Sequence, residues 1–373
     1  MINFIKYNKK SLLLLLAIPF FYVLIFGLAY KNEVVENIPI AIYDEDQSNL
    51  SRIIINAIND SEKYHIVAYA NTKEDLQDIL QQHQALASLE IPANFSKDVK
   101  QGKSPYLMFV TNANNLMFHN AMMSSIGQIL QTISVGTGQK ILESMDLLPD
   151  KAMHAVAPFL LSVRIINNPT TSYNNFMLAG LGANGLQIAI LLLVAPVFSG
   201  CIFKETQLAN LLKRKLYETI LPYWVCSTAT FVIIAYLPAL LFQLPNKANF
   251  FPLIVLGSSF TIFVIGICCL ASALAANSVN SIQLPLLYIM PGLLFSGLSW
   301  PKYAMNELSK SISATMPFSY TGESLRALIL ANNTNNLTSN IIYSYICALI
   351  CFLLAILVLK AKILFLKRKV KTS

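Results

Sequence analysis

Six long apolar stretches constrain this chain more than any other feature of its sequence. A membrane-spanning helix needs about 20 consecutive, mostly apolar residues, and each of these stretches is long enough to cross a bilayer. Charged residues make up 12% of the 373 residues, about half the share found in soluble domains, which excludes a single soluble domain. The sequence predicts membrane-spanning helices over Leu12–Tyr30, Phe176–Phe203, Thr219–Phe242, Phe251–Ala275, Ser281–Ser299 and Ile341–Leu359.

The first apolar stretch follows Lys6, Lys9 and Lys10, as the apolar core of a secretory signal follows its basic residues. Signal-peptide cores are about 7–15 residues long and end at a small-residue cleavage site. This stretch is longer and continues through bulky side chains such as Phe20 and Phe26. We therefore expect an uncleaved signal anchor.

Charge divides the chain into two parts. Residues 31–173 contain 15 of the 19 acidic and 10 of the 27 basic side chains, which gives this segment a net charge of −5. The remaining residues carry a net charge of +13, located in the flanks and loops of the apolar stretches. This arrangement indicates a membrane surface rather than nucleic acid as the partner of the basic residues.

The distribution of Lys and Arg predicts the orientation. Short cytoplasmic loops carry an excess of these residues, whereas long domains translocate largely regardless of their charge. With the N-terminus inside, 13 basic residues lie in the inner segments and four in the short outer ones. We expect both termini in the cytoplasm and residues 31–173 outside it. The four outer residues are Lys247, Lys302, Lys310 and Arg326.

The segment 31–173 has the pattern of a small α/β domain. All six cysteines lie in the apolar stretches, so this domain has no disulfide framework and needs a core of its own. Apolar runs and helix-start signals alternate along it. The predicted strands are Ile38–Tyr43, His65–Ala70, Ala85–Ile91 and Tyr106–Thr111, and the predicted helices are Leu50–Ile58, Thr72–Gln84, Asn114–Ile133 and Thr137–Met145. The fold class is thus an α-helical polytopic membrane protein with an inserted α/β extracytoplasmic domain.

The sequence predicts neither catalytic residues nor a metal site. The four histidines lack metal-ligand spacing, and no nucleophile elbow or phosphate-binding glycine loop is present. The carboxylates of Asp44, Glu45 and Asp46 suit either a cation or a polar turn in which Ser48 caps the next helix, and turn chemistry favours the second. Cys347 and Cys351, one turn apart, suit either a metal or an apolar core, and the core is favoured.

The predicted spans contain no Asp, Glu, Lys, Arg or His. Ion-coupled carriers usually place ionisable groups at membrane depth, so their absence disfavours a self-energised carrier. The chain also lacks a GxxxxGK[ST] nucleotide-binding loop. If the protein moves a substrate uphill, we expect a separate polypeptide to supply the energy.

Four segments carry a resemblance to a known family. They are Ile18–Ala29, Ile38–Asp46 with the strand and turn at Ala87–Ser96, Phe203–Leu216, and Pro291–Pro301 followed by Met316–Tyr320 and Glu323–Arg326. In these segments, and in its order of one span, a large outer domain and five further spans, the chain resembles the ABC-2-type permeases. It is most similar to bacterial half-transporter permeases encoded beside an ABC ATPase and a periplasmic adaptor.

The resemblance implies an inner coupling loop at residues 204–218 that docks on the ATPase. Leu208, Leu211, Leu212 and Leu216 fall at helical spacing beside a basic cluster. A basic loop lying on lipid headgroups is the alternative. The residues expected to couple to the ATPase are Lys204, Glu205, Thr206, Leu208, Leu211, Leu212, Lys213 and Arg214.

The resemblance also implies re-entrant helices in an outer region, residues 300–338. Proline and glycine interrupt the fifth span, and irregular backbone at membrane depth must be buried in protein or line a cavity. An outer gate is the favoured interpretation, and a kinked helix with an interfacial Trp is the alternative. The expected gate residues are Pro291, Gly292, Phe295, Gly297, Trp300, Pro301, Pro317, Phe318 and Tyr320.

These expectations describe three parts: residues 1–30, the outer domain 31–173, and a five-helix domain 174–373 with a basic cytoplasmic tail at 360–373. By resemblance, the chain is the permease of an exporter in a bacterial inner membrane, moving a hydrophobic or amphipathic substrate. The implied partners are a cytoplasmic ATPase that binds ATP and Mg²⁺, a second permease subunit, a periplasmic adaptor and membrane lipids. A membrane-anchored receptor or scaffold, and a channel or carrier that needs no ATPase, remain as alternatives.

Overall fold

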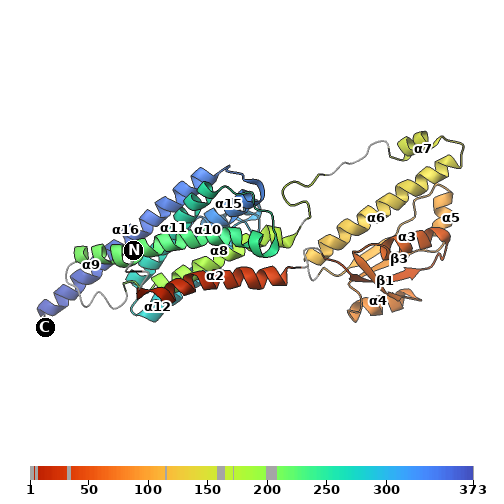
Figure 1. The fold of residues 1–373 in the computed structure, drawn as a ribbon. Coiled ribbons are helices and arrows are strands. Elements are labelled where there is room, and N and C mark those ends of the chain that lie inside the picture. The colour runs from red at the N-terminus through yellow and green to blue at the C-terminus, as the bar shows by residue number, and fades with distance from the viewer. Residues whose placement is uncertain are drawn as a thin grey trace. The chain divides into compact units, whose positions relative to one another are not determined.

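The structure, a computed structural model, describes residue 4 and residues 7–31, 35–113, 116–157, 164–170, 172–198 and 208–372. The chain divides into two compact units, residues 34–164 and residues 1–33 together with 165–373 (Figure 1).

The larger unit contains the apolar helices. Among the described residues, six helical segments are long and apolar enough to cross a membrane, which confirms the fold class of a polytopic helical membrane protein. They are α2 (Lys9–Ala29), α8 (Tyr173–Val194), the segment Leu208–Phe242 that ends in α10 (Leu221–Phe242), α11 (Phe250–Leu274), the segment Ser278–Phe295, and the first 28 residues of α16 (Leu337–Thr372).

The second predicted span ends earlier than its hydropathy indicates. Helix α8 stops at Val194 and residues 195–198 form a turn. Pro196 in this turn has no N–H to continue a helix. The remainder of the predicted span, from residue 199 to Phe203, lies outside the described residues.

The smaller unit is a four-stranded sheet with the order β2-β1-β3-β4. β1 (Ile38–Asp44) pairs in parallel with β2 (Tyr64–Tyr69) and β3 (Ala87–Ile91), and β4 (Met108–Thr111) pairs antiparallel to β3. Helices α3 (Asn49–Asn59) and α6 (Leu116–Glu143) pack on one face of the sheet, and α4 (Lys73–Gln81) packs on the other (Figure 1). The predicted α/β pattern is therefore confirmed.

The carboxylates at the end of β1 form a hydrogen-bonded polar turn. Asp44 accepts hydrogen bonds from the backbone N–H groups of Asp46 and Gln47 and from the Ser51 hydroxyl. Asp46 accepts one from the backbone of Ser96, which belongs to a short helix, α5 (Phe95–Lys100), that the sequence analysis missed. The Ser48 hydroxyl accepts from the N–H of Ser51 and so caps α3, as predicted.

Two helix predictions in this unit are wrong in their extent. The helix predicted from Thr72 to Gln84 ends at Gln81, because His83 adopts a left-handed backbone conformation with φ +57°. The helices predicted over 114–133 and 137–145 are one helix, α6. Glycines inside α6 weaken a helix by only about 1 kcal/mol each, and one of them, Gly138, lies against Val156 of α7 (Pro149–Val156).

The side chain of Tyr64 in β2 forms a hydrogen bond with α6. Its hydroxyl donates to the backbone carbonyl of Met122 in α6 at 2.7 Å. Burial raises the pKa of Tyr64 to about 12. The strand and the helix are thus joined by a buried polar contact as well as by apolar packing.

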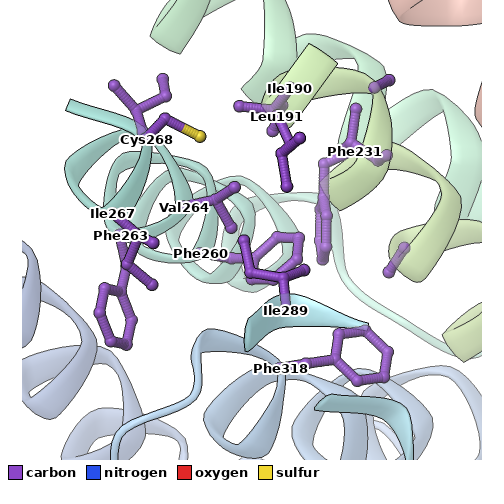
Figure 2. Close-up of a cluster of buried hydrophobic side chains, with 14 of the residues drawn as sticks. Ile190, Leu191, Phe231, Phe260, Phe263, Val264, Ile267, Cys268, Ile289 and Phe318 are labelled. Carbon is purple, nitrogen blue, oxygen red and sulfur yellow. The ribbon is translucent and has the colours of Figure 1, made fainter. Parts of the chain in front are cut away.

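Helix α11 lies at the centre of the membrane unit. Its Phe260 ring lies 5.8 Å from the Phe231 ring of α10 and 6.1 Å from the Phe318 ring of α15 (Pro317–Ala331). Figure 2 shows these rings together with Ile190 and Leu191 of α8 in one buried cluster. Inside a bilayer such close packing replaces the hydrophobic effect as the force that associates helices.

A glycine allows α2 and α8 to approach each other closely. A Cβ atom at Gly185 of α8 would lie 2.8 Å from the Tyr22 ring and 3.0 Å from the backbone Cα of Pro19, both in α2. The second of these neighbours is main chain and cannot rotate away. Any larger residue at position 185 therefore forces the two helices apart.

We expect Gly185→Val to lower the thermal stability of the purified chain in detergent. Overpacking typically costs about 1–3 kcal/mol, and a thermal scan followed by tryptophan fluorescence measures the loss. Gly127→Val is the control, since a Cβ at Gly127 in α6 meets no atom within 4 Å. Equal midpoints for Gly185→Val and the unmodified chain would contradict the described α2–α8 contact.

Candidate functional site

The predicted inner coupling segment is a helix that continues into the third span. α9 (Leu208–Lys215) passes through a π-helical turn, Leu216–Ile220, directly into α10. Three residues expected to couple to an ATPase, Lys204, Glu205 and Thr206, lie outside the described residues. The other five lie in α9.

α9 has an apolar face packed on the membrane unit and a basic face in solvent. Leu211 is fully buried, and Leu208 and Leu212 pack against the same core. α9 also contacts α16. Lys213 and Arg214 are exposed. The five described residues of the predicted set thus have two roles: the leucines hold α9 in place and the basic residues face outward.

The π-helical turn after α9 contributes two further exposed side chains, those of Leu216 and Tyr217. Leu216, at helical spacing from Leu208 and Leu212, belongs to their apolar face by sequence, yet it is 45% exposed. In the π-helical turn the backbone N–H of Leu221 donates to the carbonyl of Leu216, five residues back instead of four. Tyr217, 62% exposed, joins Leu216 on the surface, and Arg214 pairs with Glu218 at 3.8 Å. The sequence analysis did not identify Tyr217 because nothing in its pattern marks a π turn.

The outer candidate site begins where the fifth span is interrupted. α12 (Ser278–Ile289) and the short helix α13 (Gly292–Phe295) are separated by Met290 and Pro291, and Pro291 has no N–H with which to continue the helix. Gln187 of α8 lies at this break, and its side-chain N–H donates to the carbonyl of Ile289 at 3.4 Å. Gln187 is 1% exposed. It was missed from the sequence because it carries no charge.

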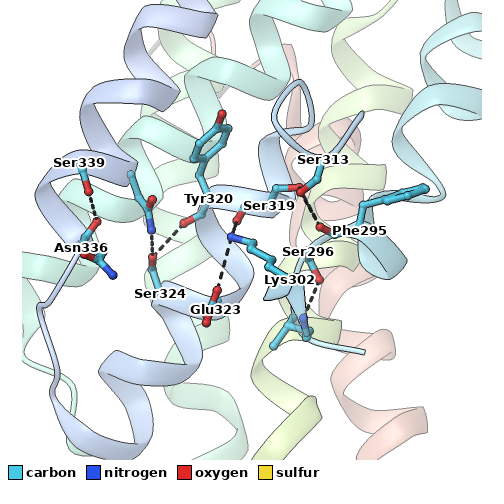
Figure 3. A network of polar contacts seen from close by, with 12 residues as sticks. Phe295, Ser296, Lys302, Ser313, Ser319, Tyr320, Glu323, Ser324, Asn336 and Ser339 are labelled. Atoms are coloured by element: carbon cyan, nitrogen blue, oxygen red, sulfur yellow. Dashed lines mark hydrogen bonds and ion pairs between the residues drawn. The ribbon is translucent and has the colours of Figure 1, made fainter. Parts of the chain in front are cut away.

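Two serines bind the carbonyl at the end of α13. The Ser313 hydroxyl, at the end of α14 (Glu307–Ser313), donates to the carbonyl of Phe295 at 2.8 Å. The Ser319 hydroxyl of α15 donates to the same oxygen at 3.2 Å, and the two hydroxyls are 3.1 Å apart (Figure 3). Because irregular backbone at membrane depth needs internal partners, these serines hold α13, α14 and α15 together at one atom.

The turn after α13 depends on glycines. Gly297 has φ +85°, a conformation that other residues rarely adopt. The next residue, Leu298, is buried and fits between α8 and α15. A Cβ atom would lie 2.4 Å from Leu298 at Gly180 of α8 and 2.9 Å from it at Gly322 of α15. Leu298 therefore packs the turn closely against α8 and α15.

Lys302 connects the turn to α15 electrostatically. Its ammonium group donates to the carbonyl of Ser319 at 2.6 Å and lies 3.4 Å from a carboxylate oxygen of Glu323 (Figure 3). Both side chains are partly in solvent, where such pairs contribute about 0–1 kcal/mol. The pair thus orients the segment and adds little to its stability.

The expected gate residues do not all come together. Phe295, Gly297, Pro317 and Phe318 lie around the Ser313–Ser319 network or in the core beside it. The Tyr320 hydroxyl donates to the carbonyl of Ala314 at 2.6 Å. Pro291 and Gly292 lie at the break between α12 and α13, and Trp300 and Pro301 are exposed.

Trp300 is 56% exposed. Tryptophan is enriched at the membrane–water interface because its ring is apolar and its N–H is polar. The exposure of Trp300 thus fits both the gate interpretation and the alternative of an interfacial tryptophan.

The metal-binding residue types and the cysteines are the other candidate groups in the described part of the chain. In that part no group of three or more His, Cys, Asp or Glu side chains is placed to hold a metal ion. Cys268 and Cys269 are buried in α11, and Cys347 and Cys351 of α16 are partly buried. The outer and inner regions described above are therefore the functional candidates.

We expect Ser313→Ala and Ser319→Ala to be mild individually and costly together. Either serine alone still provides a donor to the Phe295 carbonyl, whereas the double variant leaves a buried acceptor unsatisfied, at a cost of about 1–3 kcal/mol. A double-mutant cycle on thermal or denaturant unfolding measures the coupling. Strict additivity of the two single effects would show that the serines do not share this carbonyl.

A known protein family matches most of the chain. The sequence model of the family described as ABC-2 family transporter protein matches residues 9–357. The match begins at the first residue of α2 and ends within α16, so it includes both compact units. No curated protein matches the chain.

Proposed function

The chain belongs to the ABC-2 transporter family and is a permease component of an ABC transporter; from this premise we propose that it exports a hydrophobic or amphipathic substrate, driven by a separate ATPase. The proposed setting is a bacterial inner membrane, with both termini in the cytoplasm. ATP and Mg²⁺ bind to the ATPase subunit. A second permease subunit and a periplasmic adaptor complete the proposed assembly.

One observation carries the proposed coupling: α9 and α10 are joined without a loop. A force applied to the exposed residues of α9 is transmitted along a continuous helical segment into the membrane. The buried Leu211 prevents α9 from moving independently of the bundle. In the proposed orientation α9 lies on the cytoplasmic side, where the ATPase binds.

Packing offers a route from α10 to the outer region. The Trp224 indole N–H of α10 donates to the Ser258 carbonyl of α11, and the Thr228 and Thr261 hydroxyls are 3.0 Å apart. Between the same two helices, the Phe231 ring of α10 packs on the Phe260 ring of α11. The Phe260 ring also packs on the Phe318 ring of α15. We propose that movement of α10 reaches the Ser313–Ser319 network through these rings.

The substrate class follows from what the spans lack. The predicted spans carry no Asp, Glu, Lys, Arg or His, so they provide no ring of charge that selects an ion. An apolar or amphipathic molecule crosses such a path at the lowest desolvation cost. The α/β unit is proposed to contact the adaptor or to control release of the substrate.

We expect Lys213→Glu to weaken binding of the ATPase. Lys213 is exposed on α9. In the proposed complex it faces a surface of the ATPase that accepts a lysine, so a carboxylate at this position is repelled. We expect the affinity for the ATPase to fall about tenfold or more. Co-purification and ATP hydrolysis by the complex measure the effect. Lys247→Glu, in the segment between α10 and α11, is the control, and equal loss with both variants would contradict docking on α9.

We expect Phe260→Leu to reduce transport per ATP hydrolysed several-fold while ATP hydrolysis continues. The shorter side chain no longer bridges Phe231 and Phe318. Phe263→Leu is the matched control, because Phe263 lies on the same helix and is 2% exposed. Transport and hydrolysis measured together in proteoliposomes give the ratio. A fall in both activities by the same factor for Phe260→Leu would argue against transmission through these rings.

A further inference from the structure

An open apolar groove of about 480 Å³ lies between α11, α12 and α16. Phe263, Leu270 and Leu274 of α11 line it, together with Leu284 of α12 and Cys351 of α16. Leu274 and Leu284 are each at least half exposed. The groove is therefore accessible from the surface that faces the bilayer.

The groove matches one leaflet in length. On α11 it runs from Phe263 to Leu274, the half of the helix that ends at residue 274. Eleven residues of α-helix rise about 16 Å, and one leaflet contributes about 15 Å to the hydrocarbon core of a bilayer. Tyr288 and Thr315 also line the groove, and the Tyr288 hydroxyl donates to the backbone carbonyl of Thr315 at 2.6 Å.

A cation lies where the groove ends at Leu274. Lys362 of α16 donates to the carbonyls of Leu274 at 3.1 Å and Ala275 at 3.0 Å. These two carbonyls occupy two of its three N–H groups. Within the described part of the chain no carboxylate forms an ion pair with Lys362. The third N–H therefore has room for an external anion.

We propose that this groove binds one acyl chain of an anionic glycerophospholipid, whose headgroup contacts Lys362. In the orientation with both termini inside, the lipid comes from the cytoplasmic leaflet. The apolar walls take the chain, and the ammonium group selects a negative headgroup. The site is separate from α9, it adjoins the Ser313–Ser319 network through Ala314 and Thr315, and it does not depend on the identity of the transported substrate.

The test uses the purified full-length chain in detergent, with phosphatidylglycerol and phosphatidylcholine of identical acyl chains as probes. Native mass spectrometry counts the lipids that remain bound. We expect one phosphatidylglycerol to be retained in preference to phosphatidylcholine. Lys362→Gln reduces that preference about fivefold, the size of one basic residue's contribution at a lipid surface, and Lys360→Gln, on an exposed part of α16, leaves it unchanged.

A second pair of measurements locates the chain. Ala271→Phe, in the wall of the groove, lowers retention of both lipids, with thermal unfolding confirming that the variant is folded. A phosphatidylglycerol with a photoreactive acyl chain labels peptides that contain Leu270–Leu274 or Leu284–Tyr288. The proposal would be overturned if Lys362→Gln and the unmodified chain retained phosphatidylglycerol equally, or if both lysine variants lost the same amount of it. It would also be overturned if the label avoided both peptides, or if a second copy of the chain occupied the groove.

Discussion

The outer part of the membrane unit depends on satisfying backbone carbonyls where a helix is interrupted. Lipid offers no hydrogen-bond donors, so a broken helix is stable only when other protein groups supply them. Gln187 supplies a donor to Ile289, and Ser313 and Ser319 supply two to Phe295. Because these donors lie on α8, α14 and α15, the interruption ties separate helices to α12 and α13.

Further contacts join the outer region to α8 and α15. Leu298 fits between Gly180 and Gly322, and Lys302 bridges Ser319 and Glu323. Packed contacts of this kind rearrange between discrete states more readily than they deform continuously. The helix α9 is anchored in the same unit by the fully buried side chain of Leu211. Both candidate regions therefore consist of rigid elements joined through α10 and α11.

The spans and most strands were predictable because their signals are local. Hydropathy located the six membrane helices, and the apolar runs located the four strands. The donors to Phe295 lie 18 and 24 residues further along the chain, and only the folded arrangement pairs them. The π turn at Leu216 and the single helix α6 were missed for a similar reason: packing against neighbouring segments, and not local propensity, decides their geometry.

Hydrogen exchange over residues 292–320 tests the central claim most directly, because it requires no knowledge of the substrate. The claim is that an ATPase outside this chain drives movement of the outer region. With the chain and its ATPase in lipid nanodiscs, ATP bound to a hydrolysis-deficient ATPase should change the exchange of this segment, and ATP added to the chain alone should not. No change in the complex, or the same change without the ATPase, would contradict the account.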